Sequence, residues 1–110
     1  MSYRGSVKED RFAPGRAAMR AAILDADGVT PRAARQAAFD GTPLPDAAAT
    51  ARYVATVRAH AYKVTDEDVA AVRAEGKDDP AIFELTVAAA IGQSTQQYDA
   101  ALAALAEAVG

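Results

Sequence analysis

Cysteine and tryptophan are absent from the chain, and histidine occurs once, as His60. Without cysteine there is no disulfide and no thiol-based redox reaction, because peroxide reduction needs a thiolate that no other side chain replaces. One histidine with scattered carboxylates is no recognisable ligand set, so we expect no metal and no other cofactor. Phosphate-loop, dinucleotide and serine-nucleophile motifs are also missing. Thiol peroxidase activity is therefore excluded.

Long apolar runs are missing too. No stretch approaches the roughly 20 apolar residues that span a bilayer. No apolar run follows the mixed charged and small residues at the N-terminus, as it would in a secretory signal. We therefore expect no membrane association and a cytoplasmic location, with which the lack of disulfides agrees.

Alanine, by contrast, supplies about a quarter of the 110 residues, and it is the strongest helix former. The chain is long enough for one domain with one core. Residues 1–12 show no periodicity and are predicted to form a flexible N-terminal arm, and residues 13–110 a single helical domain. Because alanine buries little apolar area, the core is expected to be thin. Association between subunits is the expected compensation.

The expected fold is an all-α, compact bundle of about five helices with a long C-terminal helix. Pro14, Thr30 with Pro31, and Asp46 are expected to begin the first three helices, and Thr65 with Asp68 to form a capping box for the fourth. The helices are expected at residues 15–25, 31–39, 47–61, 66–75 and 79–108. The last of these would be roughly 40 Å long, so it either bends at Gly92 or packs its far end against another subunit.

Charge is distributed unevenly along the chain. The first 35 residues are basic, and the remainder is acidic, giving a formal net charge of -3. The basic part either binds nucleic acid or docks on the acidic body of the same chain. Because the chain is acidic overall and no aromatic residue is interleaved with Arg16, Arg20, Arg32 and Arg35, docking is favoured and nucleic acid is not an expected partner.

The runs AYKVTDEDVAAVRAEG at 61–76 and IFELTVAAAIG at 82–92 resemble the C-terminal half of the carboxymuconolactone decarboxylase and alkylhydroperoxidase D-like superfamily, over roughly residues 50–105. The resemblance implies an all-helical fold whose subunits assemble by helix packing. The family's peroxidases use a Cys-x-x-Cys pair with a glutamate and a histidine before this region, and this chain has neither cysteine nor histidine there. After Gly92, where relatives often carry arginine, the chain has Gln93, Gln96 and Gln97.

Two sets of residues are candidates for chemistry or ligand binding. His60 and Glu84 would form an acid-base pair if the fold brought them together. In the alternative, His60 is a partly exposed helix residue and Glu84 forms an ion pair with an arginine. Tyr53, Tyr62 and Tyr98 either line a ligand pocket or lie at the edge of the core and at interfaces.

The leading functional prediction is a non-redox, oligomeric binding or accessory module. Its partners would be further copies of the chain and either another protein or a small molecule. The alternative is a decarboxylase-like enzyme that uses His60 and Glu84 on a small carboxylic acid. The residues predicted to form the oligomer interface lie on the last helix: Phe83, Val87, Ile91, Tyr98, Leu102 and Leu105.

Overall fold

The computed structural model describes residues 13–25, 27–44 and 47–109, and the arm predicted for residues 1–12 lies outside these ranges. The described residues form five α-helices and one short 3₁₀ helix, and no strand occurs among them, which confirms the predicted all-α class. The helices are α2 (Ala13–Asp25), α3 (Arg32–Asp40), α4 (Ala48–His60), α5 (Asp66–Ala74) and α6 (Asp79–Val109), and the 3₁₀ helix η1 (Ala61–Lys63) follows α4.

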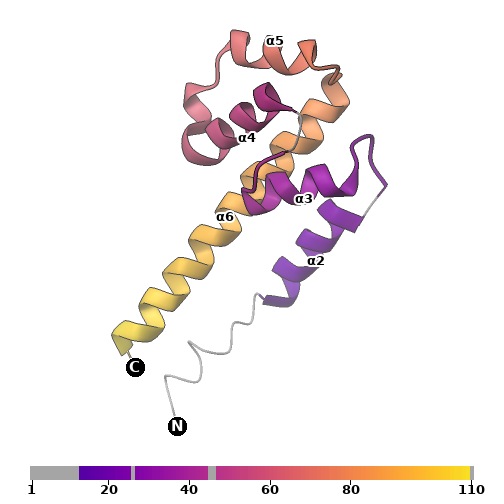
Figure 1. The fold of residues 1–110 in the computed structure, drawn as a ribbon. Coiled ribbons are helices and arrows are strands. Elements are labelled where there is room, and N and C mark those ends of the chain that lie inside the picture. The colour runs from indigo at the N-terminus through magenta and orange to yellow at the C-terminus, as the bar shows by residue number, and fades with distance from the viewer. Residues whose placement is uncertain (1–12, 26, 45–46, 110) are drawn as a thin grey trace.

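Helix α6 is the axis on which the other helices are arranged (Figure 1). Helices α3 and α4 pack on its first half, α5 packs on α4, and α2 lies against both α3 and α6. As predicted, α6 is long and continuous, with 31 residues. Its second half extends beyond the packed helices, so the molecule is elongated, measuring 58 × 29 × 20 Å.

The core lies between the first half of α6 and the four other α-helices, each of which contributes at least one buried side chain. Its largest fully buried side chains are those of Leu24, Val72, Leu85 and Thr50. The rest of the buried cluster combines larger side chains, such as Phe39, Tyr53 and Ile82, with the small residues Ala38, Ala88 and Ala89. Because buried apolar area sets the hydrophobic stabilisation, each of these alanines contributes less than one of the larger side chains.

Two predicted helix faces differ from those observed. On α2 the spacing of Ala18, Met19, Ala22 and Ile23 predicts that Met19 lies on the buried side, but Met19 is exposed and Leu24 is buried instead. On α6 the nearly all-apolar run from Ile82 to Ile91 predicts burial on most sides, but Phe83 is exposed. Alanine makes a face apolar without fixing which side is buried, so tertiary packing decided the orientation.

The N-cap residues expected from the sequence agree with the structure at some helix starts and not at others. The capping box at Thr65 is confirmed, since its hydroxyl accepts from the Asp68 N–H and the Asp68 carboxylate accepts from the Thr65 N–H. The N-cap predicted at Thr30 is wrong: Pro31 occupies that position, and no side chain caps α3 from there. Asp46, predicted to cap α4, lies outside the described residues.

Gly92 determines how closely α3 approaches α6. A Cβ atom at this position would overlap the backbone carbonyl of Phe39 in α3. Gly92 itself is buried. One possibility that the sequence left open was a bend of the last helix at Gly92. The structure shows an uninterrupted helix in which Gly92 allows close packing.

We expect Gly92→Ala to destabilise the protein by about 1–3 kcal/mol, because the two helix backbones must separate to admit one methyl group. Gly15→Ala is the matched control, since it also lies in a helix and a Cβ there meets nothing within 4 Å. The control should be neutral or stabilising by up to about 1 kcal/mol, from helix propensity alone. Urea unfolding followed by circular dichroism measures both, and equal stabilities would contradict the close approach.

Candidate functional site

Glu84 on α6 holds the connection between α2 and α3. Its carboxylate accepts the backbone N–H of Val29 at 2.8 Å, the backbone N–H of Thr30 at 3.0 Å and the Thr30 hydroxyl at 2.7 Å. We call these three bonds the Glu84 clamp. Backbone N–H groups ahead of a helix have no partner in the helix itself, and a carboxylate is the strongest acceptor available to them.

Arg35, which is buried in α3, supports the Glu84 clamp with a positive charge next to the carboxylate. One of its Nη atoms lies 3.7 Å from the Glu84 carboxylate. The guanidinium also donates to the backbone carbonyls of Thr30 and Leu24, each at 2.9 Å. A side chain on Gly28 would run into both Arg35 and Glu84. Arginine, carboxylate and backbone therefore form one packed unit at the end of α2.

Glu75 makes the same arrangement at the start of α4. It accepts the N–H of Ala49 at 2.9 Å, the N–H of Thr50 at 2.8 Å and the Thr50 hydroxyl at 2.6 Å. Ala47 occupies the N-cap position of α4 and has no side-chain oxygen to offer. A glutamate from just beyond the end of α5 supplies the acceptor instead, so this Glu75 clamp joins two helices as well as capping one.

These bonds favour the charged form of both glutamates. The Thr30 hydroxyl, then the N–H of Val29, hold the pKa of Glu84 below its ordinary value, although burial acts in the opposite direction. The Thr50 hydroxyl, with the N–H groups of Ala49 and Thr50, likewise lowers the pKa of Glu75. A carboxylate with a lowered pKa is a weaker base and is unprotonated at neutral pH. Both glutamates are therefore suited to holding backbone in place.

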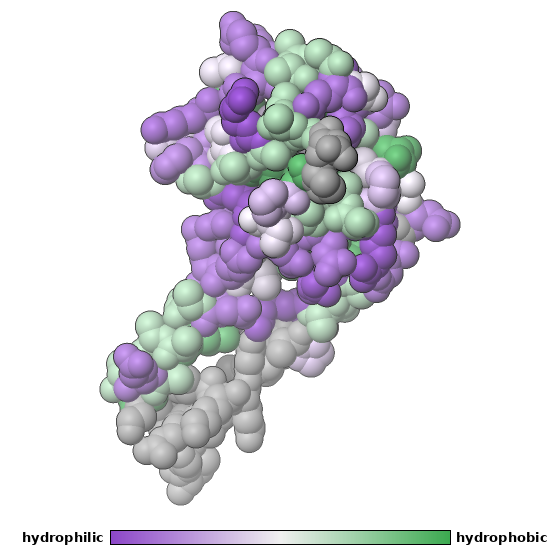
Figure 2. Space-filling view, viewed as in Figure 1, coloured by the Kyte–Doolittle hydropathy of each residue, from purple (hydrophilic) through white to green (hydrophobic). Residues whose placement is uncertain are grey.

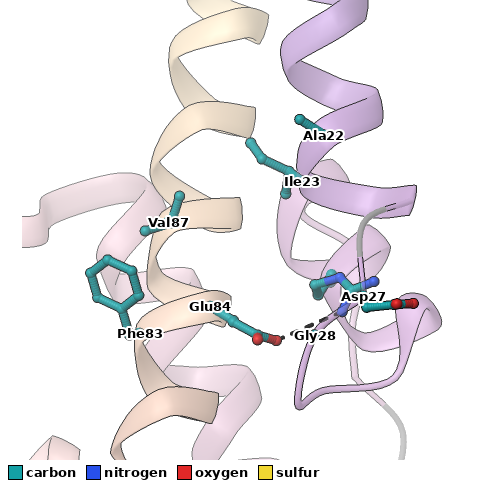
Figure 3. A pocket seen from close by; sticks show the side chains of 8 residues that line it. Ala22, Ile23, Asp27, Gly28, Phe83, Glu84 and Val87 are labelled. Atoms are coloured by element: carbon teal, nitrogen blue, oxygen red, sulfur yellow. Dashed lines mark ion pairs between the residues drawn. The ribbon is translucent and has the colours of Figure 1, made fainter.

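A cavity of about 180 Å³ opens beside the Glu84 clamp, between α2 and α6 (Figure 3). Its apolar lining comes from Ala22 and Ile23 of α2 and from Phe83 and Val87 of α6. Asp27, Gly28, Arg35 and Glu84 complete the wall. In Figure 3 Ile23 points towards α6, whereas Phe83 projects from the side of α6 away from α2. The Glu84 carboxylate and the Arg35 guanidinium in its wall are already bonded to the chain, whereas no bond from Asp27 to another described residue is found.

The described contacts do not join His60 and Glu84. His60 is exposed at the end of α4, with its ring edge-on to Tyr62 at a centroid distance of 5.8 Å. The polar partners of Glu84 in the structure are Val29, Thr30 and Arg35. An acid-base role for the pair stays a prediction, and the Glu84 carboxylate accepts three hydrogen bonds from the α2–α3 connection.

The three candidate tyrosines have three different surroundings. Tyr53 is buried, and its hydroxyl bonds the Thr86 hydroxyl at 2.7 Å. Tyr62 is exposed. Tyr98 lies under the Arg16 guanidinium, which is 4.7 Å from the ring centroid. None of the three lines the cavity beside Glu84, so a ligand pocket shared by them stays a prediction without support from these contacts.

The predicted interface residues fall into separate groups. Phe83 is exposed beside the cavity, and Val87 lines it. Ile91 packs against the core. Tyr98, Leu102 and Leu105 lie in the second half of α6, where Tyr98 and Leu105 are exposed and Leu102 is half-buried. In the single chain, the six residues therefore do not form one continuous exposed surface.

Sequence reasoning missed the polar groups that hold α3 at its C-terminal end. Arg58 of α4 donates to the carbonyls of Ala38 and Phe39. Gln96 of α6 accepts from Arg58 and donates to the Asp40 carbonyl. The polar run after Gly92 could have indicated a hydrogen-bonding role for Gln96. Nothing in the sequence predicts the bonds of Arg58, because its acceptors are backbone atoms about 20 residues away.

Basic residues of the first part of the chain form ion pairs with acidic residues of α6. Arg16 of α2 forms an ion pair with Asp99 of α6 at 2.9 Å, and Arg35 pairs with Glu84. These contacts agree with docking of basic residues on acidic ones within the chain. Among residues 13–25, 27–44 and 47–109, no group of three or more potential metal ligands comes together, and no helix is long and apolar enough to cross a membrane.

The chain matches none of the protein-family models, curated proteins or solved structures with which it was compared.

We expect Glu84→Gln to destabilise the protein by about 1–3 kcal/mol at pH 7, because an amide replaces one acceptor oxygen by a donor that faces backbone N–H groups. Glu107→Gln, an exposed glutamate near the end of α6, is the control and should be neutral. Chemical unfolding of both variants measures the difference, and equal stabilities would remove the clamp from the account.

The pH dependence of stability should change in the same variant. Because the pKa of Glu84 is lower in the folded chain than in the unfolded one, its stabilisation is present above the unfolded pKa. It is lost as the pH falls through the folded pKa. The acid loss of stability of Glu84→Gln between about pH 5 and pH 3 should therefore be shallower than that of the wild type. Parallel curves would show that Glu84 titrates normally.

Proposed function

We propose that the protein is a non-redox helical module that assembles with further copies of itself and binds a protein partner or a small molecule without covalent chemistry. The resemblance to the alkylhydroperoxidase D-like superfamily supports this proposal only through the shared helical character. Cysteine is absent from the whole chain, which excludes the thiol cycle of that family's peroxidases.

One observation carries the proposal: large apolar side chains on α6 are left uncovered. Phe83 is 69% exposed, Leu105 49%, Val109 40% and Tyr98 38%. Single exposed apolar residues are ordinary on a protein surface, but these follow one helix that extends beyond the helices packed on its first half. Figure 2 shows apolar, green surface along that end of α6.

The chemistry of the ionisable groups points the same way. The two glutamates with lowered pKa are held by backbone and hydroxyl donors, and Arg35 and Arg58 donate to backbone carbonyls. A general base needs a pKa near the working pH and a free lone pair directed at substrate. Glu84 has a lowered pKa and its carboxylate already accepts three hydrogen bonds, so the decarboxylase-like alternative has less support than binding.

Native mass spectrometry and sedimentation equilibrium test the proposal directly. We expect an oligomer whose population rises between about 1 and 100 µM protein, by mass action. A reproducible extra mass on the oligomer would identify a bound small molecule and support the ligand branch. A monomer over this whole range would contradict the assembly part of the proposal.

A further inference from the structure

The second half of α6 carries a regular apolar stripe. Tyr98, Leu102, Leu105 and Val109 follow one another at intervals of four, three and four residues. We call these four residues the C-terminal seam. Alternating steps of three and four keep side chains on one face of a helix and are the spacing of a two-helix coiled-coil contact. The pattern therefore indicates that another helix covers this face.

Within the chain, the described helices leave most of the seam uncovered. Helices α3, α4 and α5 lie at the first half of α6, and α2 reaches towards the second half through Arg16, which contacts Tyr98 and Asp99 (Figure 1). Beyond that point Leu105 and Val109 are exposed and Leu102 is half-buried. Helix α2 lies along the continuation of the same face, because Ile23 and Val87 line the cavity between the two helices.

The intervals between the four seam residues are the same whether they are counted from the N-terminal or from the C-terminal end. The intervals four, three, four are symmetric about a point between Ala103 and Ala104. Two copies related by a two-fold axis through that point would place Tyr98 against the partner's Val109. They would also place Leu102 against the partner's Leu105. A self-complementary patch of this kind is what an isologous dimer requires.

We propose that the C-terminal seam pairs with the seam of a second copy of this chain, as an antiparallel two-helix contact centred between Ala103 and Ala104. The occupant is thus a second copy, and this inference rests on the assembly proposed above. It adds the surface, the orientation and the residue pairing.

The positions of the helices favour the antiparallel orientation. In a parallel pair the partner's α6 would continue past Tyr98 towards Val87, along the face on which α2 lies. In the antiparallel pair the partner helix ends opposite Tyr98, which Arg16 of α2 contacts from one side and which remains partly exposed. The two packed bodies then lie at opposite ends of the dimer.

The flanks of the seam are compatible with this pairing. Ala101, Ala106 and Ala108 border it, and small residues let two helix backbones approach closely. Asp99, the one charge beside the seam, is already paired with Arg16 of its own chain. In the proposed register it faces the partner's Ala106, so no like charges meet. A contact of four residue layers is small, so we expect a dissociation constant on the order of micromolar.

The absence of cysteine makes the register directly measurable. We would introduce Tyr98→Cys and Val109→Cys in separate chains and oxidise each variant alone and the two mixed. The antiparallel register predicts a cross-linked dimer mainly in the mixture, because only the unlike pair comes within disulfide range. Cross-linking of each variant alone, with none between them, would show a parallel pair and overturn the proposal. Glu107→Cys, which lies on the opposite face of α6, is the control and should not cross-link with either variant.

A second pair of measurements separates this inference from the function it rests on. Leu102→Asp with Leu105→Asp should raise the dimer dissociation constant more than about 100-fold, with the helical circular dichroism unchanged. A dimer that persists in this variant would overturn the seam while leaving self-association intact.

A wild-type monomer would overturn both proposals. If that monomer were also destabilised by Leu105→Asp, the seam would be covered within its own chain, which equally refutes the second copy as its occupant.

Discussion

A glutamate carboxylate bonded to two backbone N–H groups and a threonine hydroxyl holds the connection between α2 and α3 on α6. A second set of bonds of the same kind, made by Glu75, holds the start of α4. Alanine faces fit together in several ways at similar free energy, whereas hydrogen bonds to a charged group have a defined geometry. Glu84 and Glu75 fix the starts of α3 and α4, and Arg58 fixes the end of α3.

Close packing on one side of α6 leaves other apolar side chains of the helix uncovered. Leu85, Ala88, Ala89 and Gly92 form the side of α6 that contacts α3 and α4, so the backbones lie close and little volume remains to be filled. Other large apolar residues of α6, Phe83 and those from Tyr98 onward, stay wholly or partly exposed. Burying them against a second copy would add apolar contact that the monomer lacks.

Local patterns predicted the helices well, and distant contacts could not be predicted in the same way. The capping box at Thr65 and Asp68 was correct because both partners lie within one turn. The partner of Thr30 was missed because Glu84 lies 54 residues away, and no periodicity connects them. Leu24 rather than Met19 faces inward on α2, since an alanine-rich helix has no dominant apolar face. The sequence marked Glu84 as a candidate acid-base residue, but its bonding to the α2–α3 connection could be seen only in the fold.

Hydrogen exchange of the backbone amides of residues 99–109, measured at low and high protein concentration, tests the central claim most directly. An end of a helix without a partner opens easily, and association slows its exchange by mass action. Slower exchange in 99–109 at the higher concentration, with 81–92 unchanged, is the result that a seam between two copies predicts. Exchange in 99–109 that does not depend on concentration would contradict the assignment of this face to a second copy.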